Sequence, residues 1–159
     1  MEIRILKPGE CQAREIDAFC ELVTMGEQVP LEGLSGRIRN AHLLAFAYDA
    51  DKLVAVTAVK NPAIAYRNDV FKKAGVYDLA AHYPFEIGYA FTIKRYRGRG
   101  LHQELLYDLM TKIGAENCYA TTKAENVPYI LEKLHFKKTG SDYKNEDGES
   151  LKLFTYSRK

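Results

Sequence analysis

A glycine-rich loop carries the clearest chemistry in this chain. Residues 95–101 read Arg-Tyr-Arg-Gly-Arg-Gly-Leu, between a strand-like run and a helix-like one. The two glycines allow a tight turn, so successive N–H groups and the unpaired donors of the first helical turn point at one spot. The dipole of the helix adds positive potential there. The loop therefore predicts a site for a phosphate or a pyrophosphate.

The strand-like run before the loop, residues 85–93, has two different faces. Because side chains alternate along a strand, one face carries four bulky residues: Ile87, Tyr89, Phe91 and Ile93. The other face carries one carboxylate and then three small residues: Glu86, Gly88, Ala90 and Thr92. We expect the bulky face in the core, and a ligand or another chain segment close against the small face.

The elements that must position this strand and loop are mixed. Alternation predicts strands over residues 2–7, 42–48, 53–59 and 119–122, and a closing hairpin that turns at residues 145–148. Apolar spacing predicts helices near residues 10–25 and 101–113, and a later helix that Asn126 caps. Residues 30–40 are ambiguous, and residues 61–83 are interpreted as an insertion with some helix that packs over one end of the sheet.

Length and composition narrow the function classes. At 159 residues, with 23 Lys+Arg against 21 Asp+Glu, the chain is expected to be a single domain spanning residues 1–159. The net charge of +2 gives no reason to expect binding to nucleic acid or to an anionic membrane. The three cysteines lack metal-ligand spacing, and no apolar run approaches the ~20 residues that cross a bilayer. We expect a cytoplasmic protein without a metal or a membrane partner.

At this point the residues resemble a known family. The order of elements resembles the GNAT superfamily of acetyl-coenzyme A-dependent N-acetyltransferases. The elements are a strand, then Arg97-Gly98-Arg99-Gly100-Leu101-His102, an amphipathic helix, a short strand, Asn126 and a last helix. The family signature is Arg or Gln, two residues, Gly, one residue, then Gly or Ala. It fits in two frames, one starting at Arg95 and one at Arg97. The frame from Arg97 places the helix leucines better, although it puts His102 at the last position.

The resemblance implies an α/β fold with a central mixed, mostly antiparallel sheet flanked by helices and splayed open at the strand over residues 85–93. It implies that acetyl-coenzyme A binds there, with its pantetheine arm paired to the backbone of Phe91, Thr92 and Ile93. The amides from Gly98 to His102 would hold the pyrophosphate, and Asn126 belongs to the same coenzyme site.

In the family's chemistry a primary amine attacks the thioester directly, so a base near the amine is useful. Glu86 is the candidate base, because a glutamate at the matching strand position serves protein-acetylating members; the alternative is a solvated or salt-bridged carboxylate at a strand end. Many members protonate the departing thiolate with a tyrosine, but the corresponding residue here is Leu131. Tyr129 is the catalytic candidate in its place, with Tyr119, Tyr89 or water as further possibilities.

Two other functions stay open beside the N-acetyltransferase. A non-catalytic acyl-coenzyme A sensor would keep the coenzyme site without the chemistry, and the missing tyrosine favours that alternative. An RNA-binding module could use the loop arginines, but the near-zero net charge disfavours it. The acceptor could be a small-molecule or protein amine, and a homodimer is left open.

Overall fold

The computed structural model describes residues 1–26, 30–114, 116–123 and 129–157. Its contacts divide the chain into two compact parts. The first part comprises Met1–Lys60 and Ile87–Gly114, and the second comprises Asn61–Glu86 and Ala115–Lys159. Strand β4 (Phe85–Thr92) starts in the second part and continues into the first.

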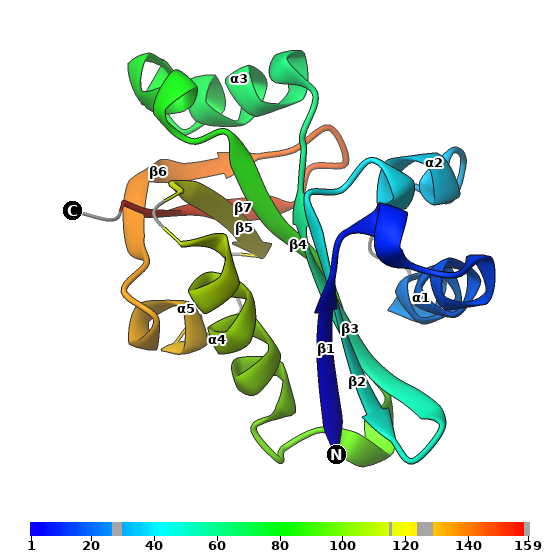
Figure 1. Ribbon diagram of the computed structural model, residues 1–159. Helices are drawn as coiled ribbons and strands as arrows, with labels where there is room; N and C mark the ends of the chain where they lie inside the picture. The colour runs from blue at the N-terminus through cyan, green and yellow to red at the C-terminus, as the bar shows by residue number, and fades with distance from the viewer. Residues whose placement is uncertain (27–29, 115, 124–128, 158–159) are drawn as a thin grey trace. The chain divides into compact units, whose positions relative to one another are not determined.

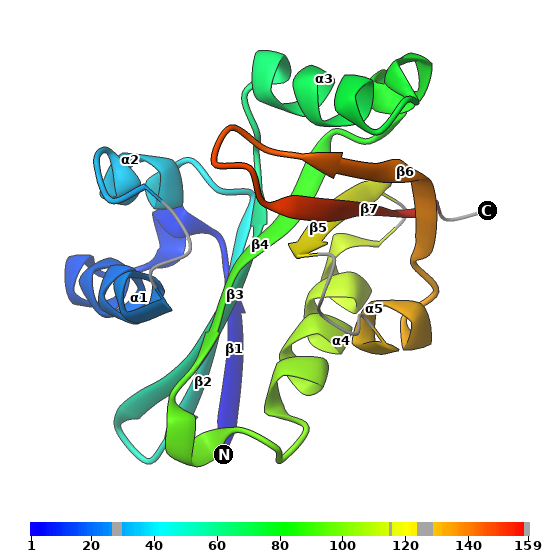
Figure 2. The ribbon, with the colours of Figure 1, turned by 180° about the vertical axis from the view of Figure 1, so that it is seen from behind.

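In the first part, a meander of strands carries helices on both faces. The strands are β1 (Glu2–Leu6), β2 (Leu43–Asp49) and β3 (Lys52–Lys60), paired antiparallel, with β4 beside β3. Helices α1 (Ala13–Gly26) and α2 (Leu34–Arg39) cover one face, and α4 (Leu101–Ile113) covers the other (Figures 1 and 2). Short 3-10 turns cover Pro8–Glu10 and Lys94–Tyr96.

Apolar residues at helical spacing explain how these helices attach. Helix α1 buries four such residues: Ile16, Phe19, Leu22 and Val23. The Phe19 ring meets the Phe46 ring of β2 edge-on, with centroids 5.4 Å apart. Helix α4 buries five: Leu101, Leu105, Leu106, Leu109 and Ile113. Gly114, with φ 72°, ends α4 in a conformation that suits glycine.

The second part contains the predicted insertion and the end of the chain. The insertion forms α3 (Ile64–Lys73) and a 3-10 helix over Tyr77–His82. The remaining elements are β5 (Cys118–Lys123), α5 (Tyr129–Lys133), β6 (Lys137–Lys144) and β7 (Ser150–Tyr156). Strand β7 pairs antiparallel with both β5 and β6. The predicted hairpin is confirmed, since the Gly148 N–H donates to the Asn145 carbonyl at 3.0 Å.

Hydrogen-bonded neighbours run in the order β1-β2-β3-β4-β5-β7-β6. The described ladders are antiparallel, except that β4 pairs parallel with β5 through Phe85–Cys118 and Glu86–Tyr119. The prediction of a mixed, mostly antiparallel sheet with flanking helices is confirmed. The boundary between the two parts falls directly after Glu86. The expected opening of the sheet at this strand and the single domain remain predictions.

Two smaller expectations have plain outcomes. The ambiguous stretch over residues 30–40 contains helix α2. Asn126, which was predicted to cap the last helix and to bind coenzyme, lies outside the described residues. Among the residues that the structure describes, no helix combines the length and the apolar character that a bilayer crossing requires.

Candidate functional site

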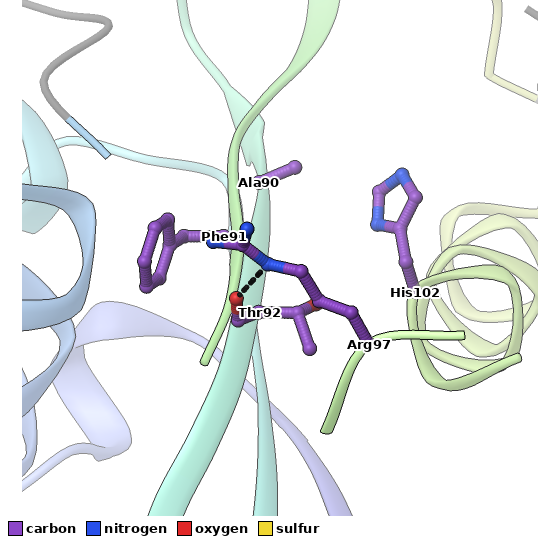
Figure 3. A pocket seen from close by; sticks show the side chains of 5 residues that line it. All are labelled: Ala90, Phe91, Thr92, Arg97 and His102. Atoms are coloured by element: carbon purple, nitrogen blue, oxygen red, sulfur yellow. Dashed lines mark hydrogen bonds between the residues drawn. The ribbon is translucent and has the colours of Figure 1, made fainter. Parts of the chain in front are cut away.

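A shallow hollow of about 300 Å³ lies in the first part, where strand β4 meets the start of helix α4 (Figure 3). Five residues line it: Ala90, Phe91, Thr92, Arg97 and His102. Four of the predicted coenzyme residues, Phe91, Thr92, Arg97 and His102, thus lie around one hollow. Ala90 is absent from the predicted coenzyme set, although the alternation of the strand places it on the small face next to Thr92.

Strand β4 presents different side chains to its two sides at this hollow. The Phe91 ring points away from helix α4, and it packs against the core that helix α1 covers (Figure 3). Ala90 and Thr92 point toward the side on which Arg97 and His102 lie (Figure 3). The two small side chains leave room there, and Ala90 is exposed. The small face of the strand therefore forms the floor of the hollow, as the sequence predicted.

Arg97, the first residue of the preferred signature frame, ties the loop to the strand. Its Nε–H donates to the backbone carbonyl of Thr92 at 2.8 Å (Figure 3). Its guanidinium carbon also lies 5.4 Å from the centroid of the Phe91 ring. Together these contacts hold a positive charge against the edge of β4, beside the hollow.

The two glycines of the loop are exposed and have open space beside their backbone. Gly98 and Gly100 have φ of 76° and 75°, a region that glycine occupies at little cost. A Cβ added at either glycine would meet no heavy atom within 4 Å. The Glu104 N–H donates to the Gly100 carbonyl at 3.0 Å, so the N–H groups of residues 101–103 precede the first backbone bond of the helix. This arrangement of amides suits an anion.

Tyr96 fixes the other two loop arginines. Its hydroxyl donates to Asp49 at 2.5 Å, and this hydrogen bond raises the pKa of Tyr96 above its usual value. The guanidinium carbons of Arg95 and Arg99 lie 5.6 Å and 5.2 Å from the centroid of the Tyr96 ring. The three loop arginines are exposed, and each lies beside an aromatic ring of the same region.

The His102 side chain lines the hollow from the first turn of helix α4 (Figure 3). Burial lowers the pKa of His102 from its ordinary value, because a charged imidazolium loses hydration there. The imidazole is therefore neutral at neutral pH. It can donate one hydrogen bond and accept another.

The backbone of Ile93 already makes two hydrogen bonds within the protein. Its N–H donates to the Val54 carbonyl at 2.9 Å, and its carbonyl accepts the Tyr96 N–H at 2.8 Å. Its side chain packs against the core under helix α1. The Ile93 N–H is therefore committed to strand β3, whereas its carbonyl oxygen keeps a second lone pair. The expected pairing of the Ile93 backbone with the pantetheine arm remains a prediction.

An unusual backbone conformation interrupts strand β4 before the hollow. Tyr89 has φ 57°, which is rare for a bulky residue and marks local strain. The Lys60 ammonium lies 4.4 Å from the centroid of the Tyr89 ring. A Cβ at Gly88 would come within 2.8 Å of the Lys60 Cδ. The segment that lies close against Gly88 is therefore the side chain of Lys60.

Glu86, the candidate base, lies at the start of β4 in the second part of the chain. Glu86 is buried, with an exposed fraction of 4%, so it is not a solvated carboxylate, while the alternative of a salt-bridged carboxylate stays open. The Tyr66 hydroxyl donates to Glu86 Oε2 at 3.1 Å. Glu86 also faces Tyr119 across the parallel ladder. The carboxylate is thus held in place by a hydrogen bond, and its role as the base remains a prediction.

Two tyrosines of this cluster are unsuited to act as bases. Burial, and then the charge of Glu86, raise the pKa of Tyr143 to about 12. The same two causes raise the pKa of Tyr119 far above its ordinary value. Both phenols therefore stay protonated at neutral pH.

Solved structures resemble the whole chain. An acyl-CoA N-acyltransferase from Pseudomonas aeruginosa has a TM-score of 0.73 at 14% identity, over 98% of this chain and 99% of that chain. A GNAT-family acetyltransferase from Bacillus cereus has a TM-score of 0.66 at 10% identity, over 100% and 99%. The fold is the GNAT fold. YncA from Salmonella typhimurium, solved with its cofactor acetyl-CoA, has a TM-score of 0.65 at 13% identity, over 100% and 94%.

No family model and no curated protein matches the chain, so the likeness to solved structures is what shows the GNAT fold.

Helix α5 carries the residues considered for protonation of the departing sulfur. Leu131 is buried on this helix. Tyr129, the candidate proton donor, lies on the same helix with 54% of its surface exposed. The Lys133 ammonium lies 5.6 Å from the centroid of its ring. The role of Tyr129 remains a prediction.

Proposed function

We propose that this chain is an N-acetyltransferase that moves an acetyl group from acetyl-coenzyme A to a primary amine. One observation carries the proposal. An exposed glycine-rich loop adjoins a hollow on strand β4, and the same strand begins with the buried carboxylate of Glu86. The GNAT fold supports acyl transfer, and a neighbour of that fold was solved with acetyl-CoA.

The residues around the hollow fit the coenzyme. The amides from Gly98 to His102 would hold the pyrophosphate, because the space over both glycines is open and the helix amides precede the first intrahelical bond. Phe91 and Thr92 would border the pantetheine arm, and Arg97 would supply positive charge beside it. Asn126 remains a coenzyme candidate from the sequence alone.

The chemistry assigned to the chain is proton transfer. Acetyl-coenzyme A, when bound, supplies the acetyl thioester. Glu86 takes a proton from the ammonium group of the acceptor, and this leaves a neutral amine with a lone pair that can attack. Tyr129 is the candidate that gives a proton to the departing sulfur, and water is the alternative donor.

Calorimetry with acetyl-coenzyme A, followed by thiol release with a panel of amines, tests the proposal. We expect a micromolar Kd, on the order of −7 to −8 kcal/mol, and turnover with at least one amine class. The panel needs polyamine, aminoglycoside, amino-acid and peptide acceptors, because the sequence leaves all four open. Binding without turnover on any amine would favour the acyl-coenzyme A sensor. Absence of binding would contradict the coenzyme site itself.

A further inference from the structure

Helix α3 of the insertion is firmly attached within the second part of the chain. Its buried residues are Val70 and Phe71, and Phe71 is completely enclosed. The Phe71 ring meets Tyr119 edge-on at 5.1 Å and stacks on Tyr83 at 5.7 Å. These contacts fix the helix against residues of the sheet. A side chain one turn earlier on this helix therefore has a defined position.

Tyr66 is the side chain one turn earlier. Its hydroxyl reaches Glu86 and donates to Oε2 at 3.1 Å, while 45% of the Tyr66 surface remains exposed. Helix α3 thus brings an exposed residue of the insertion to a carboxylate whose own exposed fraction is 4%. A buried carboxylate depends on such donors, because burial removes the water that would otherwise stabilise its charge.

The surroundings of Glu86 make this donor more important. Titratable and charged side chains of three elements surround Glu86 in this cluster: Tyr66, Arg67 and Asp69 of α3, Tyr119 of β5 and Tyr143 of β6. The charge of Glu86 raises the pKa of both Tyr119 and Tyr143, after burial as the first cause. Both phenols remain neutral beside it. The Tyr66 hydroxyl donates a hydrogen bond to the carboxylate at 3.1 Å.

We propose that Tyr66 is a positioning residue for Glu86. The inference rests on the proposed function, in which Glu86 is the base. The hydrogen bond from Tyr66 favours the ionised carboxylate and fixes the orientation of Oε2. Tyr66 keeps its own proton and acts only through Glu86. The insertion over residues 61–83 therefore contributes to the reaction by shaping the base.

A Tyr66→Phe variant removes the hydroxyl and keeps the exposed ring, so the fold should be retained. We expect turnover to fall about three- to tenfold at neutral pH, with unchanged affinity for acetyl-coenzyme A. The acidic limb of the pH–rate profile should move to higher pH by about half a unit or more, because the carboxylate then protonates more easily. Tyr107→Phe, at a 60% exposed tyrosine of helix α4, is the matched control. A parental acidic limb in Tyr66→Phe would overturn the proposal.

A double-mutant cycle separates this inference from the base assignment. In a Glu86→Gln background, Tyr66→Phe should cause no further loss of turnover, since the two residues act as one unit. An equal loss in both backgrounds would overturn the positioning role and leave Glu86 as the base. Parental turnover in Glu86→Gln alone would overturn the base assignment, and with it the role of Tyr66.

A second readout needs no turnover. The carboxyl-carbon NMR signal of Glu86 reports its protonation directly as pH is lowered. We expect the midpoint of this transition in Tyr66→Phe to lie above that of the parent by about half a unit or more. Equal midpoints in the two proteins would overturn the proposal even if no acceptor amine had been found.

Discussion

The Nε–H of Arg97 donates to the backbone carbonyl of Thr92 at 2.8 Å, so the signature arginine is tied to the strand that precedes its own loop. The same guanidinium lies 5.4 Å from the Phe91 ring. A residue of the glycine-rich loop thus helps to define the edge of β4. The shape of the hollow depends on this link.

Replacing Arg97 with lysine should weaken the coenzyme site although the charge is kept. Lysine cannot reproduce the Nε–H bond to Thr92 or stack as a planar group on Phe91. We expect the Kd for acetyl-coenzyme A, measured by calorimetry, to rise about tenfold, or about 1.4 kcal/mol. Arg95→Lys is the control, because Arg95 contacts the Tyr96 ring and not the hollow. Equal effects of the two changes would contradict the role given to Arg97.

His102 should make the stability of the protein sensitive to acid. Because burial lowers the pKa of His102, the unfolded chain binds this proton more readily than the folded chain does. The unfolding free energy therefore decreases as pH falls through the unfolded value of about 6.5 toward the lower folded value. Urea unfolding from about pH 8 to about pH 5 should show a shallower decrease for His102→Asn than for the parent.

The control for this measurement is His82→Asn, at an exposed histidine of the second part. Its unfolding free energy should follow pH as the parent's does. If the His102→Asn and parental curves ran parallel over the whole range, the buried, neutral state of His102 would be wrong.

Gly140 should be far less replaceable than Gly148, although both have positive φ, 67° and 78°. A Cβ at Gly140 would collide with the carbonyl oxygen of Ala74, which also accepts the Ser141 N–H at 2.9 Å. A Cβ at Gly148 would meet nothing within 4 Å. We expect denaturant unfolding to show a loss of about 1 kcal/mol for Gly148→Ala and about 3 kcal/mol or more for Gly140→Ala. Similar losses would argue against the contact between β6 and the end of helix α3.

Tyr129→Phe examines the candidate proton donor. If Tyr129 protonates the departing sulfur, its loss should lower the turnover number about tenfold, while the affinity for acetyl-coenzyme A stays the same. Steady-state kinetics and calorimetry measure the two quantities separately. Because the ring is 54% exposed, the change should not affect folding. An unaltered turnover number would remove Tyr129 and leave water as the donor.

Local patterns were sufficient to predict several elements closely. Helix α4 has the predicted bounds, Leu101–Ile113, because its apolar residues repeat at helical spacing between two glycines. Alternation along residues 85–93 correctly placed Tyr89, Phe91 and Ile93 toward the core, and Ala90 and Thr92 at the hollow. The resemblance to the GNAT superfamily placed Phe91, Thr92, Arg97 and His102 in one site, and the structure brings these four together.

Other features depend on contacts between distant residues, which one sequence does not reveal. Tyr66 meets Glu86 only because helix α3 packs on Tyr119, so nothing local marks Tyr66. The left-handed backbone of Tyr89 opposes the intrinsic preference of a bulky residue, and it has no signal in the sequence. The Ile93 N–H donates to the Val54 carbonyl of the neighbouring strand β3, a partner that the sequence around Ile93 does not indicate.

The most direct test of the central claim is mass spectrometry of amines incubated with acetyl-coenzyme A and the purified protein. We expect an acetylated amine with the parent, and about 10²-fold less in the same time with Glu86→Gln at neutral pH. Part of the loss should be recovered at higher pH, where the free amine is populated in solution. Glu146→Gln, at an exposed glutamate of the closing hairpin, should match the parent. A protein that binds acetyl-coenzyme A but yields no acetylated amine, or a Glu86→Gln variant with parental yield from about pH 6 to about pH 9, would contradict the account.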